Sequence, residues 1–304
     1  MALLWLGSVV HATGSSLACP DWPTCFGSMT PEMVGGVFWE HSHRLVAGGL
    51  ILVFLLGTAL AWRPEADRPW IRRWCLIGIA ALLFQAVLGG LTVIFRLPPA
   101  ISTSHLALAY LFLGLAVVLT LATGPSRRLA PEPDPNRASS VRRFALWVAG
   151  LVFVQSLVGA AVRHTEAGMA CPDIPLCLGK VVPPMANGLI AIHFTHRVLG
   201  YIVVLATMAL LIHVKRHTSS SRLHAQAAVA AMGAIVQAGL GFASVYTTLG
   251  VVPVSLHTLV AASVLAVLVA MITLTWPSRV EAAGGSRAPL DETAGATEGA
   301  AGGH

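Results

Sequence analysis

The chain has 304 residues, of which 56% are hydrophobic and only 11% charged, and its formal net charge is +6. This balance lies outside the range of soluble globular domains and indicates a membrane protein, with lipid as its surroundings. The basic residues are scattered in short loops between apolar stretches, which argues against a nucleic-acid partner.

A bilayer core about 30 Å thick requires about 20 apolar residues in each spanning helix. Seven segments meet this requirement, and each is predicted to be a transmembrane helix. They are residues 37–61, 74–95, 101–123, 144–162, 189–213, 225–247 and 252–276.

An eighth apolar stretch, Met1 to Ala12, precedes these segments. At about 1.5 Å per residue it reaches only about 18 Å, which is too short to span the bilayer. Two explanations are open: the start of the sequence is truncated or misassigned, or the helix enters the membrane only partway. A signal peptide is disfavoured because no basic residues precede the stretch. The predicted fold is therefore all-α, with eight helices in a polytopic membrane protein and a shortened first helix.

The distribution of Lys and Arg predicts the orientation, because cytoplasmic loops collect positive charge. The loops after the second, fourth and sixth helices carry twelve of these residues, and the alternate loops carry only Arg96, Arg163 and Lys180. We therefore expect both termini in the cytoplasm and the alternate loops outside. The twelve are Arg63, Arg68, Arg72, Arg73, Arg127, Arg128, Arg137, Arg142, Arg143, Lys215, Arg216 and Arg222.

A repeat relates the two halves of the sequence. The segment Cys19-Pro-Asp-Trp-Pro-Thr-Cys25 recurs 152 residues later as Cys171-Pro-Asp-Ile-Pro-Leu-Cys177. Because this offset spans an even number of helices, both halves have the same orientation, and we expect an axis along the membrane normal to relate them. Further matches at 152 or 153 residues are His43-Arg44 with His196-Arg197, Gln85 with Gln237, and His105 with His257.

Each half offers two histidines at a similar depth near the outer ends of two helices. His43 and His105 are 62 residues apart, and His196 and His257 are 61 apart. Two imidazoles from different helices at one level can ligate a heme iron from both faces, and ionisable residues at membrane depth usually serve function. The sequence therefore predicts two heme sites, one for each pair.

Two other interpretations of these histidines are open. Each could be a hydrogen-bonding partner between helices, although the matched spacing of both pairs disfavours this for the whole set. A zinc or copper site usually has three or four nitrogen or sulfur ligands, and only Glu40 could complete one, in the first half.

Glu40 lies three residues before His43, so a helix places both on one face. The corresponding residue of the second half is His193. A carboxylate in one half only can move protons or stabilise a developing cation there, so we assign catalysis to the first half and to Glu40. The alternative is an interfacial carboxylate that is solvated or paired with Arg44.

Several other polar residues near the outer ends are candidates for a role. Arg44 and Arg197 follow the predicted ligands and could pair with heme propionates or extend to the membrane surface. The two cysteine pairs fall in outer loops, where disulfides persist, and structural disulfides are the default reading, with a redox role open for the first pair. The candidate substrate-side histidines are His11, His41, His164 and His193.

In these features the sequence resembles the heme A synthase family. The resemblance rests on the Glu-x-x-His-Arg motif from Glu40 to Arg44, on the single histidines that open the fourth and eighth helices, and on cysteine-containing outer loops in two four-helix halves. It covers the chain up to about Trp276. It implies an oxidoreductase of the cell membrane that oxidises the C8 methyl group of heme O to a formyl group by successive hydroxylations, yielding heme A for terminal oxidases.

The resemblance also implies a division of labour. Residues 1–124 would bind heme O as the substrate, with Glu40 supporting its oxidation, and residues 143–276 would bind a heme b that passes electrons. From composition, the Pro-rich and polar residues 125–142 are predicted to form a cytoplasmic linker, and the Gly/Ala-rich residues 277–304 a disordered cytoplasmic tail. A functional disulfide between the first two cysteines is implied, with heme O synthase and terminal oxidase assembly factors as partners and a homo-oligomer left open.

Two features depart from the family pattern: the shortened first helix, which leaves the catalytic half less enclosed, and the second cysteine pair, to which we assign a structural role only. Functions of two other classes compete with this one. A diheme electron carrier would not need Glu40 in one half only and would be expected to stack its hemes across the bilayer. A transporter with parallel repeats would need a site at the midplane, whereas the ionisable residues here cluster near the outer ends.

Overall fold

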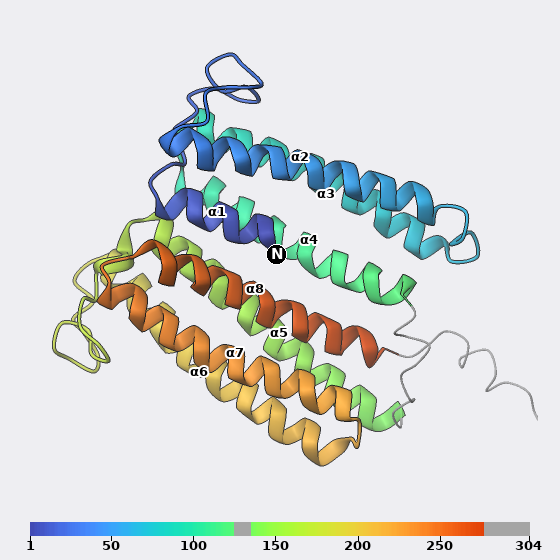
Figure 1. Ribbon diagram of the computed structural model, residues 1–304. Coiled ribbons are helices and arrows are strands. Elements are labelled where there is room, and N and C mark those ends of the chain that lie inside the picture. Colours follow the sequence, from blue (N-terminus) through green and yellow to red (C-terminus); the bar gives the residue numbers. More distant parts are fainter. Residues whose placement is uncertain (125–134, 277–304) are drawn as a thin grey trace, which may run out of the picture.

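The computed structural model describes residues 1–124 and 135–276 (Figure 1). In these ranges the protein is all-helical. The predicted tail and residues 125–134 of the predicted linker lie outside the described part. The α-helices are α1 (Ala2–Ala12), α2 (Gly35–Ala61), α3 (Pro69–Ile94), α4 (Pro99–Thr123), α5 (Pro135–His164), α6 (Gly188–His217), α7 (Ser221–Tyr246) and α8 (Val251–Leu274).

Seven of these helices, α2 to α8, are long and apolar enough to cross a membrane, whereas α1 has 11 residues. The seven predicted spans are therefore confirmed. The helices extend beyond most of the predicted apolar cores, because backbone hydrogen bonding continues into polar sequence. Thus α5 begins at Pro135, so the part of the predicted linker from 135 to 142 is helical. Proline stands at the start of α3 and α4, where its missing N–H leaves no hydrogen bond unmade.

Large apolar side chains cover the outside of the helices. Leu52, Leu60 and Trp147 are 68%, 69% and 80% exposed. In water such surfaces would be unfavourable, whereas in a bilayer they contact lipid tails of equal polarity. The protein is a multi-pass membrane protein.

The helices pack in chain order within each half. In the first half α1, α2, α3 and α4 contact one another in sequence, and in the second half α5 to α8 form a ring that closes where α5 packs against α8. The halves meet where α8 contacts α1 and α4 and where α5 contacts α4. The loops between α1 and α2 and between α5 and α6, each carrying a cysteine pair, lie at one end of the bundle, called here the cysteine-loop end (Figure 1).

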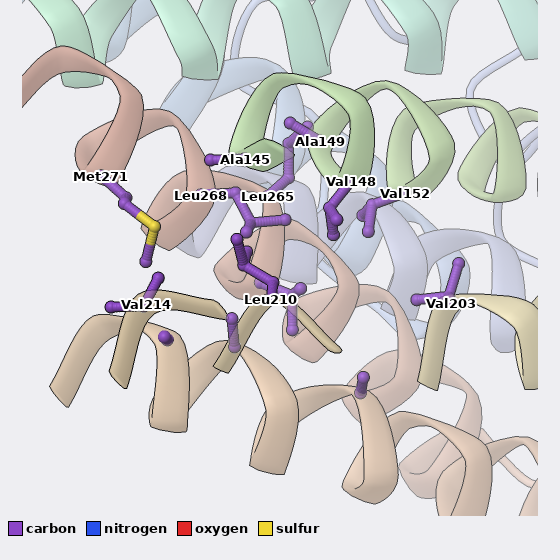
Figure 2. Packing of buried hydrophobic residues seen from close by; sticks show 14 of the residues in the cluster. Ala145, Val148, Ala149, Val152, Val203, Leu210, Val214, Leu265, Leu268 and Met271 are labelled. Carbon is purple, nitrogen blue, oxygen red and sulfur yellow. The ribbon is translucent and has the colours of Figure 1, made fainter. Parts of the chain in front are cut away.

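The principal hydrophobic core lies in the second half. Figure 2 shows Val148 and Val152 of α5, Leu210 of α6, and Leu265 and Leu268 of α8 converging between their helices. A smaller core in the first half joins α3 to α4 through Ile71, Cys75 and Leu119, and Cys75 has a buried free thiol. The second half is therefore a closed, tightly packed bundle that can hold side chains in fixed positions.

Candidate functional site

The four predicted ligand histidines lie at two matched depths from the cysteine-loop end. His43 and His196 are each eight residues beyond the first residue of their helices, α2 and α6. His105 and His257 are each six residues beyond the start of α4 and α8. With a rise of about 1.5 Å per residue, all four imidazoles lie about 9 to 12 Å inside the helix starts. The local helix boundaries thus bring each pair to one level.

A glycine of the preceding helix lies against every one of these rings. A Cβ atom on Gly7 would come within 3.1 Å of His43, and one on Gly89 within 3.1 Å of His105. A Cβ atom on Gly159 would come within 2.7 Å of Cε1 of His196, and one on Gly241 within 3.3 Å of His257. A Cβ atom at Gly159 would force His196 to move, and one at any of the other three glycines would make an unusually tight contact with the ring. Sequence reasoning missed this set, although Gly7 with Gly159 and Gly89 with Gly241 repeat at the same offset of 152 residues.

Glutamine side chains anchor the helices that carry the histidines. Gln85 Nε2 of α3 donates a hydrogen bond to the carbonyl of His105 of α4 at 3.0 Å. Gln155 Nε2 of α5 donates to the carbonyl of His196 at 2.8 Å. The amides bind main-chain oxygens and thus fix the helix rotation that directs each ring inward.

The second histidine pair fits a metal between its rings. The ring centroids of His196 and His257 lie 6.3 Å apart with the planes inclined by 67°. Two imidazoles that bind opposite sides of one metal through bonds of about 2 Å would have centroids roughly 6 Å apart.

Unpartnered ring nitrogens mark three of the four ligand histidines. Nδ1 of His105, His196 and His257 is buried and has no hydrogen-bond partner. A buried polar atom without a partner costs free energy and calls for an explanation such as an ion or cofactor. Close glycine contacts, unpartnered nitrogens and the spacing of the rings together fit a heme between His196 and His257.

Glu40 is buried, with 5% of its surface exposed, and both of its oxygens are engaged. Oε1 pairs with Arg44 Nη2 at 2.5 Å, and Oε2 accepts the backbone N–H of Cys19 at 2.8 Å. His193 takes the corresponding place in the second half, where its Nδ1 meets the carbonyl of Ala167 at 2.8 Å. The Glu40 carboxylate is thus hydrogen-bonded to the first cysteine loop, and the second half has no carboxylate at this position.

The two arginines hold the cysteine loops. Arg44 Nη1 donates to the carbonyl oxygens of Asp21, at 2.8 Å, and Thr24. Arg197 does the same in the second half, donating to the carbonyls of Asp173, at 2.8 Å, and Leu176, and also to that of Cys171. The loop carbonyls thus provide hydrogen-bond acceptors for both guanidinium groups. The binding of heme propionates by these arginines stays a prediction.

Each cysteine loop is closed by a disulfide and by an aspartate. Cys19 is bonded to Cys25, and Cys171 to Cys177. Asp21 accepts the Thr24 hydroxyl and the N–H groups of Gly27 and Phe26, and these bonds hold the pKa of Asp21 below its ordinary value. The aspartates were missed as loop-forming residues, although both occur at the same place in the repeated motif.

Asp173 forms the matching turn in the second loop. It accepts hydrogen bonds from the N–H groups of Gly179 and Leu178, and these bonds lower its pKa as well.

Two of the candidate outer histidines meet where the halves contact: His11 Nε2 of α1 lies 3.2 Å from His164 Nδ1 of α5. These two histidines are 153 residues apart, which is the offset of the repeat, so the sequence marks them as equivalent positions of the two halves but does not show that they meet.

The fold and its histidines together define a class: a helical membrane protein of two tandem halves, each carrying two histidines at matched positions of its helices. Residues 32–269 match the COX15-CtaA family, described as cytochrome oxidase assembly protein. The match covers well over half of the chain, and the chain belongs to this family.

Curated relatives of the chain are named heme A synthase. The protein of Shouchella clausii is 30% identical over 81% of this chain and 83% of its own length. Those of Halalkalibacterium halodurans and Symbiobacterium thermophilum are 30% and 29% identical over 72% and 82% of this chain, and over 74% and 84% of their own lengths. The resemblance stated from the sequence is therefore confirmed.

Proposed function

We propose that the first half binds heme O as the substrate between His43 and His105, and that the second half binds heme b as a resident cofactor between His196 and His257. Membership of the family makes the protein an oxidoreductase that forms heme A from heme O. The packing of the halves supports this division. In the second half α5 packs against α8 and closes the ring of helices, whereas α1 and α4 make no comparable contact in the first half. A substrate must enter and leave, while a cofactor stays.

One observation supports catalysis in the first half most directly: a buried carboxylate, Glu40, stands where the second half has His193. Conversion of a methyl to a formyl group by successive hydroxylations is an oxidation that breaks C–H bonds, so a group that can take up a proton is needed nearby. Glu40 would take up a proton at a carboxylate oxygen, with Arg44 stabilising its charged form. When bound, heme b supplies one-electron redox chemistry at its iron.

The same proposal includes the orientation in the membrane. The charge bias among the loops supports a location of the cysteine loops on the outer face, with both termini in the cytoplasm. Heme O would come from a heme O synthase in the same bilayer, and heme A would pass to terminal oxidase assembly factors.

The test is mass analysis of hemes extracted from the protein purified after co-expression with a heme O source. We expect heme B together with heme O, its hydroxylated intermediate or heme A. Heme B alone would reject the synthase in favour of a diheme electron carrier, and the absence of any heme would reject both.

A ligand variant tests the assignment of the halves. His196→Ala should remove a stably bound low-spin heme B, whereas His43→Ala should retain it and lose the heme O-derived species. If His196→Ala retained the low-spin heme B, the second half would not be the cofactor site.

A further inference from the structure

The first disulfide lies against a histidine that the heme sites do not use. Cys19, Cys25 and His41 are buried together, with 0%, 0% and 3% of their surfaces exposed. One ligand atom from each, the two Sγ atoms and a ring nitrogen, lie within 4.8 Å of one another. These three residues are called here the loop triad.

The hydrogen bonding of His41 fixes which nitrogen is available. Its Nε2 lies 3.0 Å from the carbonyl oxygen of Met29. A carbonyl only accepts, so Nε2 carries the hydrogen and Nδ1 carries a lone pair. Nδ1 is buried and has no partner. Metal-binding histidines are commonly oriented in this way, with one ring N–H donated to a backbone carbonyl and the other nitrogen free for the metal.

The second loop shows that packing alone does not require the histidine. Phe194 takes the place of His41 there, at the same offset of 153 residues that relates His43 to His196. Phe194 packs against the core cluster that contains Cys171 and Cys177. An apolar ring therefore suffices to cover a disulfide in this fold, and His41 adds a nitrogen lone pair beside the first one.

We propose that the loop triad, in its dithiol form, binds one thiophilic d10 cation, Zn²⁺ or Cu⁺, through both sulfurs and Nδ1 of His41. In the disulfide form the sulfurs are bonded to each other and cannot act as thiolates, so metal and disulfide exclude each other. On metal binding each thiol releases its proton to solvent. Two thiolates and a neutral imidazole balance the charge of Zn²⁺, which favours the ion in a buried site. This inference is independent of the heme chemistry proposed above.

Glu40 is not part of the group of ligand atoms, which contains only Cys19, Cys25 and His41, and its carboxylate is paired with Arg44. Three protein ligands satisfy Cu⁺ and leave one position open on Zn²⁺, and both ions accept sulfur and imidazole nitrogen. A metal in the loop triad would keep the loop closed over Glu40 without the sulfur–sulfur bond.

The experiment uses the full chain in detergent, in a Cys171→Ser/Cys177→Ser background that leaves a single loop dithiol. A phosphine reductant opens the disulfide, with the oxygen of water ending on phosphorus and one proton on each sulfur. After anaerobic removal of the reductant, Zn²⁺ alone and Cu⁺ alone are titrated in competition with chromogenic chelators. We expect one equivalent of metal per reduced chain and none for the oxidised chain, with buried Cys75 present throughout.

His41→Phe is the matched variant, because it copies the second loop. It should weaken metal binding at least tenfold while heme content and the elution profile stay unchanged. In the chain with all native cysteines, Phe194→His should add a second equivalent of tightly bound metal after reduction. Equal affinity of the reduced chain and its His41→Phe variant, or equal uptake by oxidised and reduced protein, would overturn the proposal.

Discussion

At the scale of single residues, the ligand histidines depend on the glycines that face them. Each glycine belongs to the helix before the histidine, so a side chain added there would press on an imidazole from a neighbouring element. Cores respond to such overpacking with shifted side chains and a cost of about 1–3 kcal/mol. The glycines therefore decide whether the rings can hold their positions.

Gly159→Ala should displace His196, because the new Cβ would lie 2.7 Å from Cε1 of the ring. We expect loss of most of the low-spin heme absorbance per mole of purified protein. Gly150→Ala on the same helix is the control, since nothing lies within 4 Å of a Cβ there. A normal heme content in Gly159→Ala would contradict the contact.

Substitution of Glu40 separates its chemical role from its structural one. Glu40→Ala should retain bound heme and stop the formation of heme A, as judged by mass analysis of extracted hemes. Glu40→Gln keeps an oxygen that can accept Cys19 N–H but cannot take up a proton as a carboxylate does, so it should be equally inactive with an intact loop. Normal heme A from either variant would remove Glu40 from catalysis.

At the scale of elements, the cysteine loops are small, repeated structures with the same set of bonds. A disulfide closes each loop, an aspartate binds the turn, and an arginine from the next helix binds loop carbonyls. The arginine bonds tie the loop to the helix that carries a ligand histidine. Loop conformation and histidine position are therefore mechanically linked.

Acid should loosen the first loop. The pKa of Asp21 is lowered in the folded protein, so its contribution to stability is present above the ordinary carboxyl pKa of about 4 and is lost as the pH falls through the folded value. Hydrogen exchange at Phe26 and Gly27, corrected for intrinsic rates, should accelerate at low pH. Asp21→Asn should remove this pH dependence, and exposed Asp67→Asn should not; an unchanged profile in Asp21→Asn would refute the assignment.

At the scale of the whole molecule, the two repeated halves have the same order of helices but pack their helices differently. The second half closes on a large core, while α1 to α4 contact one another in order and rely on α8 for part of their cover. Contacts between the halves include Ser8 with Thr258, whose hydroxyl oxygens lie 2.9 Å apart, and His11 with His164. Two hemes in this arrangement would lie at similar depth in neighbouring bundles.

The orientation can be measured on intact cells. Val181→Cys in the second cysteine loop, where the native side chain is 79% exposed, should react with a membrane-impermeant thiol reagent. Ala66→Cys, at the opposite end between α2 and α3, should react only after the membrane is permeabilised. The reverse labelling pattern would invert the proposed topology.

The number of spanning helices, the repeat and the similar depth of the histidines could all be predicted from the sequence. These follow from hydropathy and spacing along the chain, because a spanning helix makes its backbone hydrogen bonds within itself and its rise per residue is constant. The prediction was weakest at helix ends, as at Pro135, since hydropathy marks the bilayer core and not the end of backbone hydrogen bonding.

Only the tertiary structure decided what each side chain meets. The glycines against the histidines, the ties of Glu40 to Arg44 and Cys19, and the lone pair of His41 beside the disulfide all depend on helix rotation and on how the loops fold back. Such contacts join residues on different elements, and hydropathy and spacing carry no information about the rotation that brings them together. Several of these positions, such as the glycines, recur at the offset of the repeat, but only the packing of the helices shows which side chains they contact.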